Sequence, residues 1–172
     1  WLYGGMLLLC AAALLSSSQQ RAEAGEQPKA PIHFAFQPIP FSLDSCESPE
    51  RHAPETMAGG LAVFDYDNDG NLDIFFTNGA DINSLKKTSS KYWNRLFHNN
   101  GDGTFTDVTE KAGLAGTGYD TGVAIGDYDN DGYEDIFVGG VYRNTLYHNN
   151  GDGTFTDVTE KAGLAHFDKQ YG

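Results

Sequence analysis

The chain has 172 residues, with 24 acidic against 11 basic side chains and a formal net charge of -13. Such an acidic surface repels a phosphate backbone, which argues against nucleic acid as the partner. Hydrophobic residues make up 40% of the chain and glycine occurs 21 times, a composition that favours short packed strands joined by tight turns.

The first predicted element is a signal peptide, residues 1–24. Residues 6–15 form an apolar run of signal-peptide length that is too short to span a bilayer. Ala22-Glu23-Ala24 offers a small-x-small cleavage site before Gly25. No basic region precedes the apolar run and the chain begins with Trp1, so we expect a truncated or wrongly assigned N-terminus. The alternative for this run is a buried apolar helix.

The signal peptide predicts a secreted, periplasmic or cell-surface protein with no membrane span. Lipidation at Cys10 is a minor alternative, because Leu9 is bulkier than the residue that usually precedes a lipidated cysteine. Cleavage would leave Cys46 as the only cysteine, which forms no intramolecular disulfide. Export would also place the chain where millimolar calcium fills even weak sites.

Residues 25–58 are predicted to be an extended, proline-rich lead. All six prolines lie between Pro28 and Pro54, whereas 18 of the 21 glycines come after this stretch. This change in composition marks a boundary near Ala58. Within the lead, the alternating residues 32–36 are predicted to form an edge strand or a strand lent to a neighbouring sheet.

Two acidic loops, residues 65–73 and 127–135, carry carboxylates at positions 1, 3, 5 and 9 and a glycine at position 6. These carboxylates repel one another in an empty site, and a hard divalent cation removes that cost. The glycine permits a sharp turn, and position 7 would offer its backbone carbonyl. Two acidic surface turns are the alternative. We predict two Ca²⁺ sites, with the ligands Asp65, Asp67, Asp69, Asn71, Asp73, Asp127, Asp129, Asp131, Tyr133 and Asp135.

The residues around each loop exclude an EF-hand. Position 12 of an EF-hand loop is a bidentate glutamate, but it is Phe76 in the first loop and Val138 in the second. The runs before and after each loop are short, apolar and rich in β-forming residues, which predicts buried strands. The predicted unit is therefore a strand, a calcium loop and a strand.

A long repeat follows the first loop. Residues 98–115 recur unchanged at 148–165, fifty residues later, whereas the acidic loops recur after 62 residues because of a 12-residue insertion, residues 80–91. Each copy is predicted to form a hairpin and then one helical turn, capped by Thr109 and ended by Gly113 in the first copy. Each unit then has four strands, as a β-propeller blade requires.

The predicted fold is therefore all-β, with an incomplete β-propeller after the signal peptide and the lead. The first blade spans residues 59–120, with the insertion 80–91, and the second spans residues 121–165. Residues 166–172 are predicted to begin a third blade. Two blades cannot close a ring of four to eight, so we expect a fragment of a longer protein.

The acidic loops, together with the Asn-Gly-Asp-Gly-Thr-Phe hairpins, resemble FG-GAP/VCBS repeats of the integrin-α type of β-propeller. The run at residues 105–114 is similar to the cartilage acidic protein and ASPIC/UnbV group. The resemblance covers roughly residues 55–172. It implies a calcium-loaded propeller in which the loop aspartates are the ligands.

The leading functional hypothesis is a secreted scaffold for adhesion or recognition, with structural calcium and an extracellular protein or glycan as partner. We expect no enzyme, because the polar residues mostly repeat, and we assign His98 and His148 to packing or hydrogen bonding. The alternative is a propeller-type polysaccharide-degrading enzyme with catalytic residues in the insertion or in missing blades. The insertion carries Lys86, Lys87 and Lys91 beside aromatic residues, and either contacts an acidic glycan or is a solvated loop.

Overall fold

The structure, a computed structural model, describes residues 33, 35–57 and 59–165. The predicted signal peptide, Cys10 and the predicted start of a third blade lie outside these residues. The chain divides into two units, residues 1–36 and 37–172, and the second unit contains every helix and strand of the described residues. Of the lead segment predicted as a strand, residues 33, 35 and 36 are described and none of them is in a strand. No helix in the described residues is long and apolar enough to cross a membrane.

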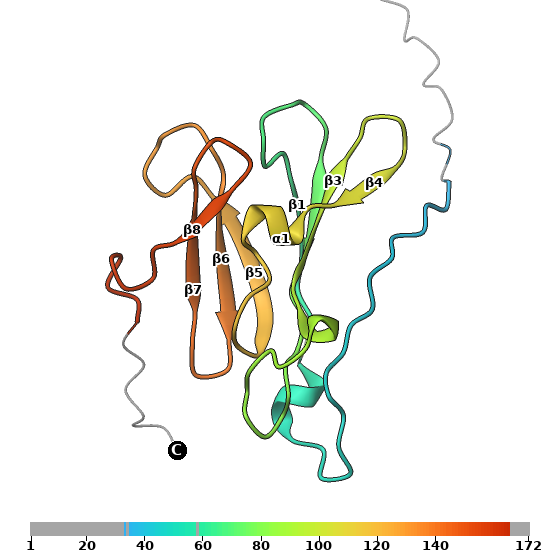
Figure 1. Ribbon diagram of the computed structural model, residues 1–172, viewed down its shortest axis with the longest axis vertical. Coiled ribbons are helices and arrows are strands. Elements are labelled where there is room, and N and C mark those ends of the chain that lie inside the picture. Colours follow the sequence, from blue (N-terminus) through green and yellow to red (C-terminus); the bar gives the residue numbers. More distant parts are fainter. Residues whose placement is uncertain (1–32, 34, 58, 166–172) are drawn as a thin grey trace, which may run out of the picture. The chain divides into compact units, whose positions relative to one another are not determined.

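Two antiparallel sheets of four strands make up the second unit (Figure 1). In both sheets the strands lie in chain order, so each sheet is a simple meander. The first sheet contains β1 (Leu61–Phe64), β2 (Asp73–Phe76), β3 (Arg95–Asn99) and β4 (Phe105–Asp107). The second contains β5 (Asp120–Gly126), β6 (Asp135–Gly140), β7 (Thr145–Asn149) and β8 (Phe155–Asp157). The predicted all-β fold with two four-stranded blades is confirmed.

The three helical elements of the described residues are each a single turn: η1 (Ala53–Thr56), η2 (Ser90–Tyr92) and α1 (Thr109–Ala112). Gly113 ends α1 at φ 77°, as predicted, but Thr109 is not its cap. Thr109 is the first helical residue; its hydroxyl donates to Asp107 at 2.6 Å and accepts the N–H of Leu96 at 2.9 Å. The Thr109 hydroxyl therefore links the helical turn to β3.

The main core lies between the two sheets. Because side chains alternate along a strand, the face of the first sheet that carries Phe75 and Leu96 meets the face of the second that carries Ile136 and Tyr147. Strands β1 and β5 approach so closely that a Cβ on Gly60 would lie 2.9 Å from the Cα of Gly122. The buried cluster contains Phe64, Tyr66, Phe75, Leu96, Ala112, Leu114, Ile136, Val138, Tyr147 and Phe155.

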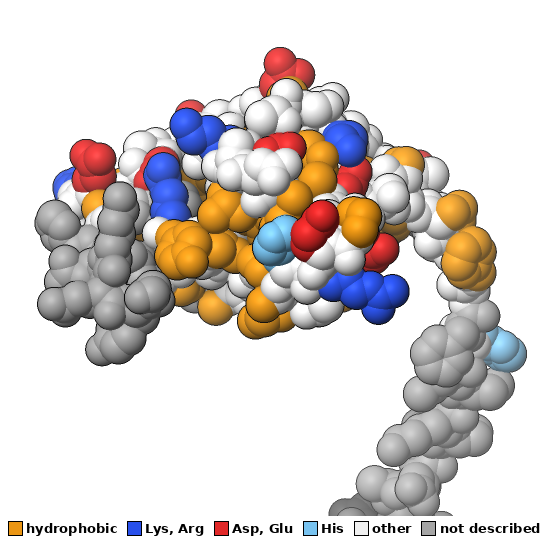
Figure 2. Space-filling view, turned by 90° about the horizontal axis from the view of Figure 1, so that it is seen from below, with side chains coloured by type: hydrophobic (Ala, Val, Ile, Leu, Met, Phe, Trp, Pro, Cys, Tyr) orange, Lys and Arg blue, Asp and Glu red, His pale blue; other side chains and the backbone are white. Residues whose placement is uncertain are grey.

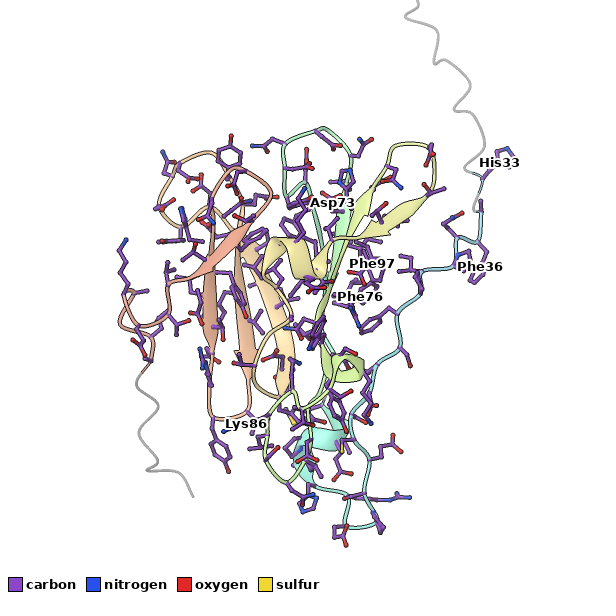
Figure 3. The ribbon with its side chains drawn as sticks, viewed as in Figure 1. His33, Phe36, Asp73, Phe76, Lys86 and Phe97 are labelled. Atoms are coloured by element: carbon purple, nitrogen blue, oxygen red, sulfur yellow. The ribbon has the colours of Figure 1, made fainter. Side chains whose placement is uncertain are left out.

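The lead packs on the outer face of the first sheet. The Phe41 ring stacks on Phe76 with 4.3 Å between centroids, and Phe76 meets Phe97 edge to face at 6.0 Å (Figure 3). Phe97 is fully buried as a result. The backbone N–H of Asp44 donates to the Asn78 side chain at 2.8 Å, which fixes the lead to the end of β2. Residues 37–57 of the lead are thus part of the folded unit.

The insertion is anchored to the folded unit through one of its three lysines. The Lys87 ammonium, 1% exposed, donates to the backbone carbonyls of Asn78, Gly79 and Tyr92 at 2.8–2.9 Å and lies 3.4 Å from Asp120. Burial lowers the pKa of Lys87, an effect that Asp120 opposes. Lys87 therefore joins the insertion to β5 and is not available to a partner. Lys86 and Lys91 are exposed, so a contact of the insertion with an acidic glycan stays a prediction.

Candidate metal centre

The first acidic loop joins β1 to β2 and folds around its own carboxylates. Asp65 accepts the backbone N–H groups of Asp69 and Gly70 at 3.0 and 2.8 Å, and Asp69 accepts that of Asn71 at 2.8 Å. Gly70 has φ 89°, a conformation that favours glycine, and this agrees with the sharp turn predicted at position 6. Ligand atoms of Asp65, Asp67 and Asp69 lie within 4.8 Å of one another. The loop thus brings together the carboxylates that the sequence singled out.

Asp73, at position 9, forms the base of this site at the start of β2 (Figure 3). It is fully buried; one carboxylate oxygen accepts the N–H of Tyr66 at 3.1 Å and the other accepts the N–H of Asn99 at 2.8 Å. Burial raises the pKa of Asp73 despite these hydrogen bonds. Its negative charge is therefore costly unless a positive charge comes close.

The second loop repeats this arrangement between β5 and β6. Asp127 accepts the N–H groups of Asp131 and Gly132 at 3.1 and 3.0 Å. Asp135, 1% exposed, accepts the N–H groups of Tyr128 and Asn149 at 3.0 and 2.8 Å. Ligand atoms of Asp127, Asp129 and Asp135 lie within 4.8 Å of one another. For the position 7 residues, Asn71 and Tyr133, ligation through the backbone carbonyl stays a prediction.

The sequence alone does not place His98 and His148 at these loops. Nδ1 of His98 lies 3.5 Å from Asp67 and 3.2 Å from Asp73, and His148 lies 3.3 Å from both Asp129 and Asp135. The signal that pointed to them was their identical position in both repeats, on the strand that pairs with β2 or β6. Only the strand register shows that this position lies next to the acidic loop.

Three buried atoms at these sites have no hydrogen-bond partner among the described residues: Oδ1 of Asp67 and Nδ1 of His98 and His148. Buried polar atoms are normally paired, so each of these three atoms can take a further partner. The ligand atoms around them are mainly hard carboxylate oxygens, which suit a hard divalent cation. Both acidic clusters can therefore hold a metal ion, and their residues fit one.

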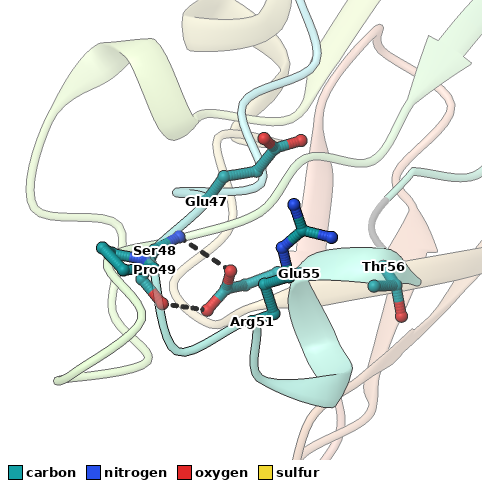
Figure 4. A pocket seen from close by; sticks show the side chains of 6 residues that line it. All are labelled: Glu47, Ser48, Pro49, Arg51, Glu55 and Thr56. Carbon is teal, nitrogen blue, oxygen red and sulfur yellow. Dashed lines mark hydrogen bonds between the residues drawn. The ribbon is translucent and has the colours of Figure 1, made fainter.

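A separate pocket of about 530 Å³ lies in the lead and η1, lined by Glu47, Ser48, Pro49, Arg51, Glu55 and Thr56 (Figure 4). Ser48 donates to Glu55 through its backbone N–H and its hydroxyl, both at 2.7 Å, and the backbone N–H of His52 donates at 3.0 Å. The Ser48 bonds lower the pKa of Glu55 to about 2. Glu55 is thus fixed as a carboxylate that holds η1, and it is a poor general acid.

Comparison with known protein families gives a match to the acidic repeats. The sequence model of the FG-GAP-like repeat matches residues 65–138 and 127–170, which together make up more than half of the chain. Both matches begin at the first aspartate of an acidic loop. No curated protein matches the chain. The match is to the repeat itself, so the narrower grouping with the cartilage acidic protein and ASPIC/UnbV group stays a prediction.

Proposed function

Because this chain belongs to the FG-GAP-like repeat family, we propose that it is a calcium-binding repeat module that acts as an adhesion or recognition scaffold outside the cytoplasm. The observation that carries the proposal is the duplicated carboxylate site, in which a buried imidazole nitrogen without a partner among the described residues faces two aspartates. The cation would be held by the four aspartates of each loop and would be structural.

Calcium is favoured by the chemistry of the donors. Each loop supplies several carboxylates at short spacing, and calcium accepts six to eight oxygen ligands in a flexible arrangement. Bound calcium would offset the repulsion among the aspartates and the cost of ionising the buried Asp73. A cation that binds only the folded state stabilises it by about 2.7 kcal/mol per site at a hundred times its dissociation constant.

The test is thermal unfolding of the full chain in millimolar calcium and in chelator. We expect calcium to raise the midpoint by several degrees, and an Asp67→Asn/Asp129→Asn variant to lose that gain. The matched control is Asp102→Asn/Asp152→Asn, which makes the same charge change at hairpin turns where each aspartate bonds its own Thr104 or Thr154. A midpoint that calcium does not move would reject the calcium sites.

The proposed partner is an extracellular protein or glycan, bound at the loops of one end. The end opposite the acidic loops carries the insertion, η1 and the β6–β7 turn (Figure 1), and hydrophobic side chains gather there among mixed charges (Figure 2). The β6–β7 turn exposes 73% of Tyr142. An exposed aromatic ring among charges is typical of protein and sugar recognition. Loss of partner capture in Tyr142→Ala, with an unchanged melting midpoint, would support this end as the binding end.

A further inference from the structure

The two acidic loops are joined by a hydrogen-bond chain that runs from one position 9 aspartate to the other. The N–H of Tyr66 donates to Asp73 at 3.1 Å, and the carbonyl of the same Tyr66 accepts Nδ2 of Asn149 at 2.8 Å. The backbone N–H of Asn149 in turn donates to Asp135 at 2.8 Å. Asn149 is fully buried, so water does not compete for these bonds. Two residues, Tyr66 and Asn149, thus separate the bases of the two sites.

A second link joins the exposed parts of the loops. Nδ2 of Asn68, at position 4 of the first loop, donates to the carbonyl of Gly132 in the second loop at 3.1 Å. The N–H of Gly132 donates to Asp127, the first carboxylate of that loop, at 3.0 Å. Asn68 lies between Asp67 and Asp69, so this link also runs from carboxylates of one site to a carboxylate of the other.

The repeat supplies an internal comparison for both links. Asn99 occupies the position in the first repeat that Asn149 occupies in the second. It makes the corresponding bonds within its own sheet, to Asp73, to the Leu72 carbonyl and to Gly101. Its Nδ2 makes no bond to the other sheet in the described residues. Asn130 corresponds to Asn68, with φ 61° against 58°. The two links therefore arise where the two sheets meet, whereas the geometry within each repeat is the same.

We propose that Asn149 and Asn68 couple the two loops, so that a cation bound in one loop raises the affinity of the other. The proposal rests on the proposed function of the loops as calcium sites. A cation held by Asp73 fixes the backbone of Tyr66, whose carbonyl then holds the Asn149 side chain, and the backbone N–H of Asn149 bonds Asp135. Because coupling between binding sites is reciprocal, occupation of the second loop favours the first equally.

The coupling is measured by calcium titration calorimetry on the full chain. Asp67→Asn leaves only the second loop able to bind and Asp129→Asn leaves only the first, which gives the two uncoupled binding constants. We expect the product of the two wild-type constants to exceed the product of the single-loop constants by about fivefold or more. Equal products overturn the coupling alone, whereas no calcium binding in any of the three proteins overturns the proposed function as well.

Substitution of the linking residues then locates the coupling. Asn149→Ala should lower the ratio of the two products, while Asn99→Ala, which removes the corresponding side-chain bonds within a sheet, should leave it unchanged. If circular dichroism shows that Asn149→Ala is unfolded, Asn68→Gly decides, because glycine accepts the positive φ and only the exposed link is lost. Asn68→Gly should lower the ratio and Asn130→Gly should not. An equal loss in the control variants, or no loss in the linking variants, overturns the assignment.

Discussion

The segments 98–115 and 148–165 have the same sequence and yet occupy different environments. Leu114 is fully buried, whereas its copy Leu164 is 39% exposed. The difference runs the other way in the hairpin, where Phe155 is 8% exposed and stacks on Tyr66, while its copy Phe105 is only partly buried. The cause is position: the helical turn of the first copy and the hairpin of the second copy pack in the core shared by the two sheets, whereas their counterparts lie outside it.

What stays constant between the copies is local. The N–H of Val108 bonds the Leu96 carbonyl at 3.0 Å, and the N–H of Val158 bonds the Leu146 carbonyl at 2.9 Å. The helical turn is assigned only in the first copy, although the second makes the corresponding backbone bonds. Hydrogen bonding within the hairpin therefore depends on the sequence, whereas the burial of the same side chains depends on the neighbouring sheet. Substitution of matched residues separates the two contributions.

The largest difference in the loss of stability between matched substitutions is expected at the leucines of the two copies. Leu114→Ala should lower the free energy of unfolding by about 2–5 kcal/mol, because it leaves a cavity in the shared core. Leu164→Ala should lower it by less than about 1 kcal/mol, since its side chain already meets solvent. Urea unfolding monitored by circular dichroism measures both values. Equal losses would show that the two copies are packed alike.

The matched glycines at the contact of β1 and β5 should give a smaller difference. A Cβ at Gly60 would lie 2.9 Å from backbone of the other sheet, whereas one at Gly122 would meet nothing within 4 Å. Gly60→Ala should destabilise by about 1–3 kcal/mol through overpacking. Gly122→Ala should change the stability by no more than about 0.5 kcal/mol. Chemical unfolding of the two variants, measured side by side, tests whether the sheets approach as closely as described.

The smallest effect is expected from acid, and it arises in the lead, which has no repeated copy. The folded state holds the pKa of Glu55 at about 2, below its ordinary value of 4.5. The charged form of Glu55 therefore contributes stability above pH 4.5 that is lost as the pH falls towards about 2. Melting midpoints between pH 6 and pH 2 should fall less steeply in Glu55→Gln than in wild type. Parallel curves for the two proteins would show that Glu55 does not contribute to the loss of stability in acid.

The sequence was sufficient for the strands, the hairpins and the acidic loops, because each depends on residues close together in the chain. Apolar runs flank the loops, and glycines with positive φ, such as Gly70 and Gly132, stand at the turns. The packing of Phe41 and the burial of Lys87 could not be predicted, because a lead and an insertion have no periodic pattern. The bond from Asn149 to Tyr66 spans 83 residues and requires the relative placement of two sheets.

The contact between Phe41 and Phe76 makes the outer faces of the two sheets different. The polypeptide places its own lead over the β2–β3 part of the outer face of the first sheet. The opposite outer face, on the second sheet, carries a hollow of about 340 Å³ whose lining includes Ala124, Phe137 and Leu164. These residues correspond to Ala62, Phe75 and Leu114, which receive the second sheet. Among the described residues, the lead thus covers part of the outer face of the first sheet, whereas the corresponding core-type side chains of the second sheet line an open hollow that a further sheet of this kind can cover.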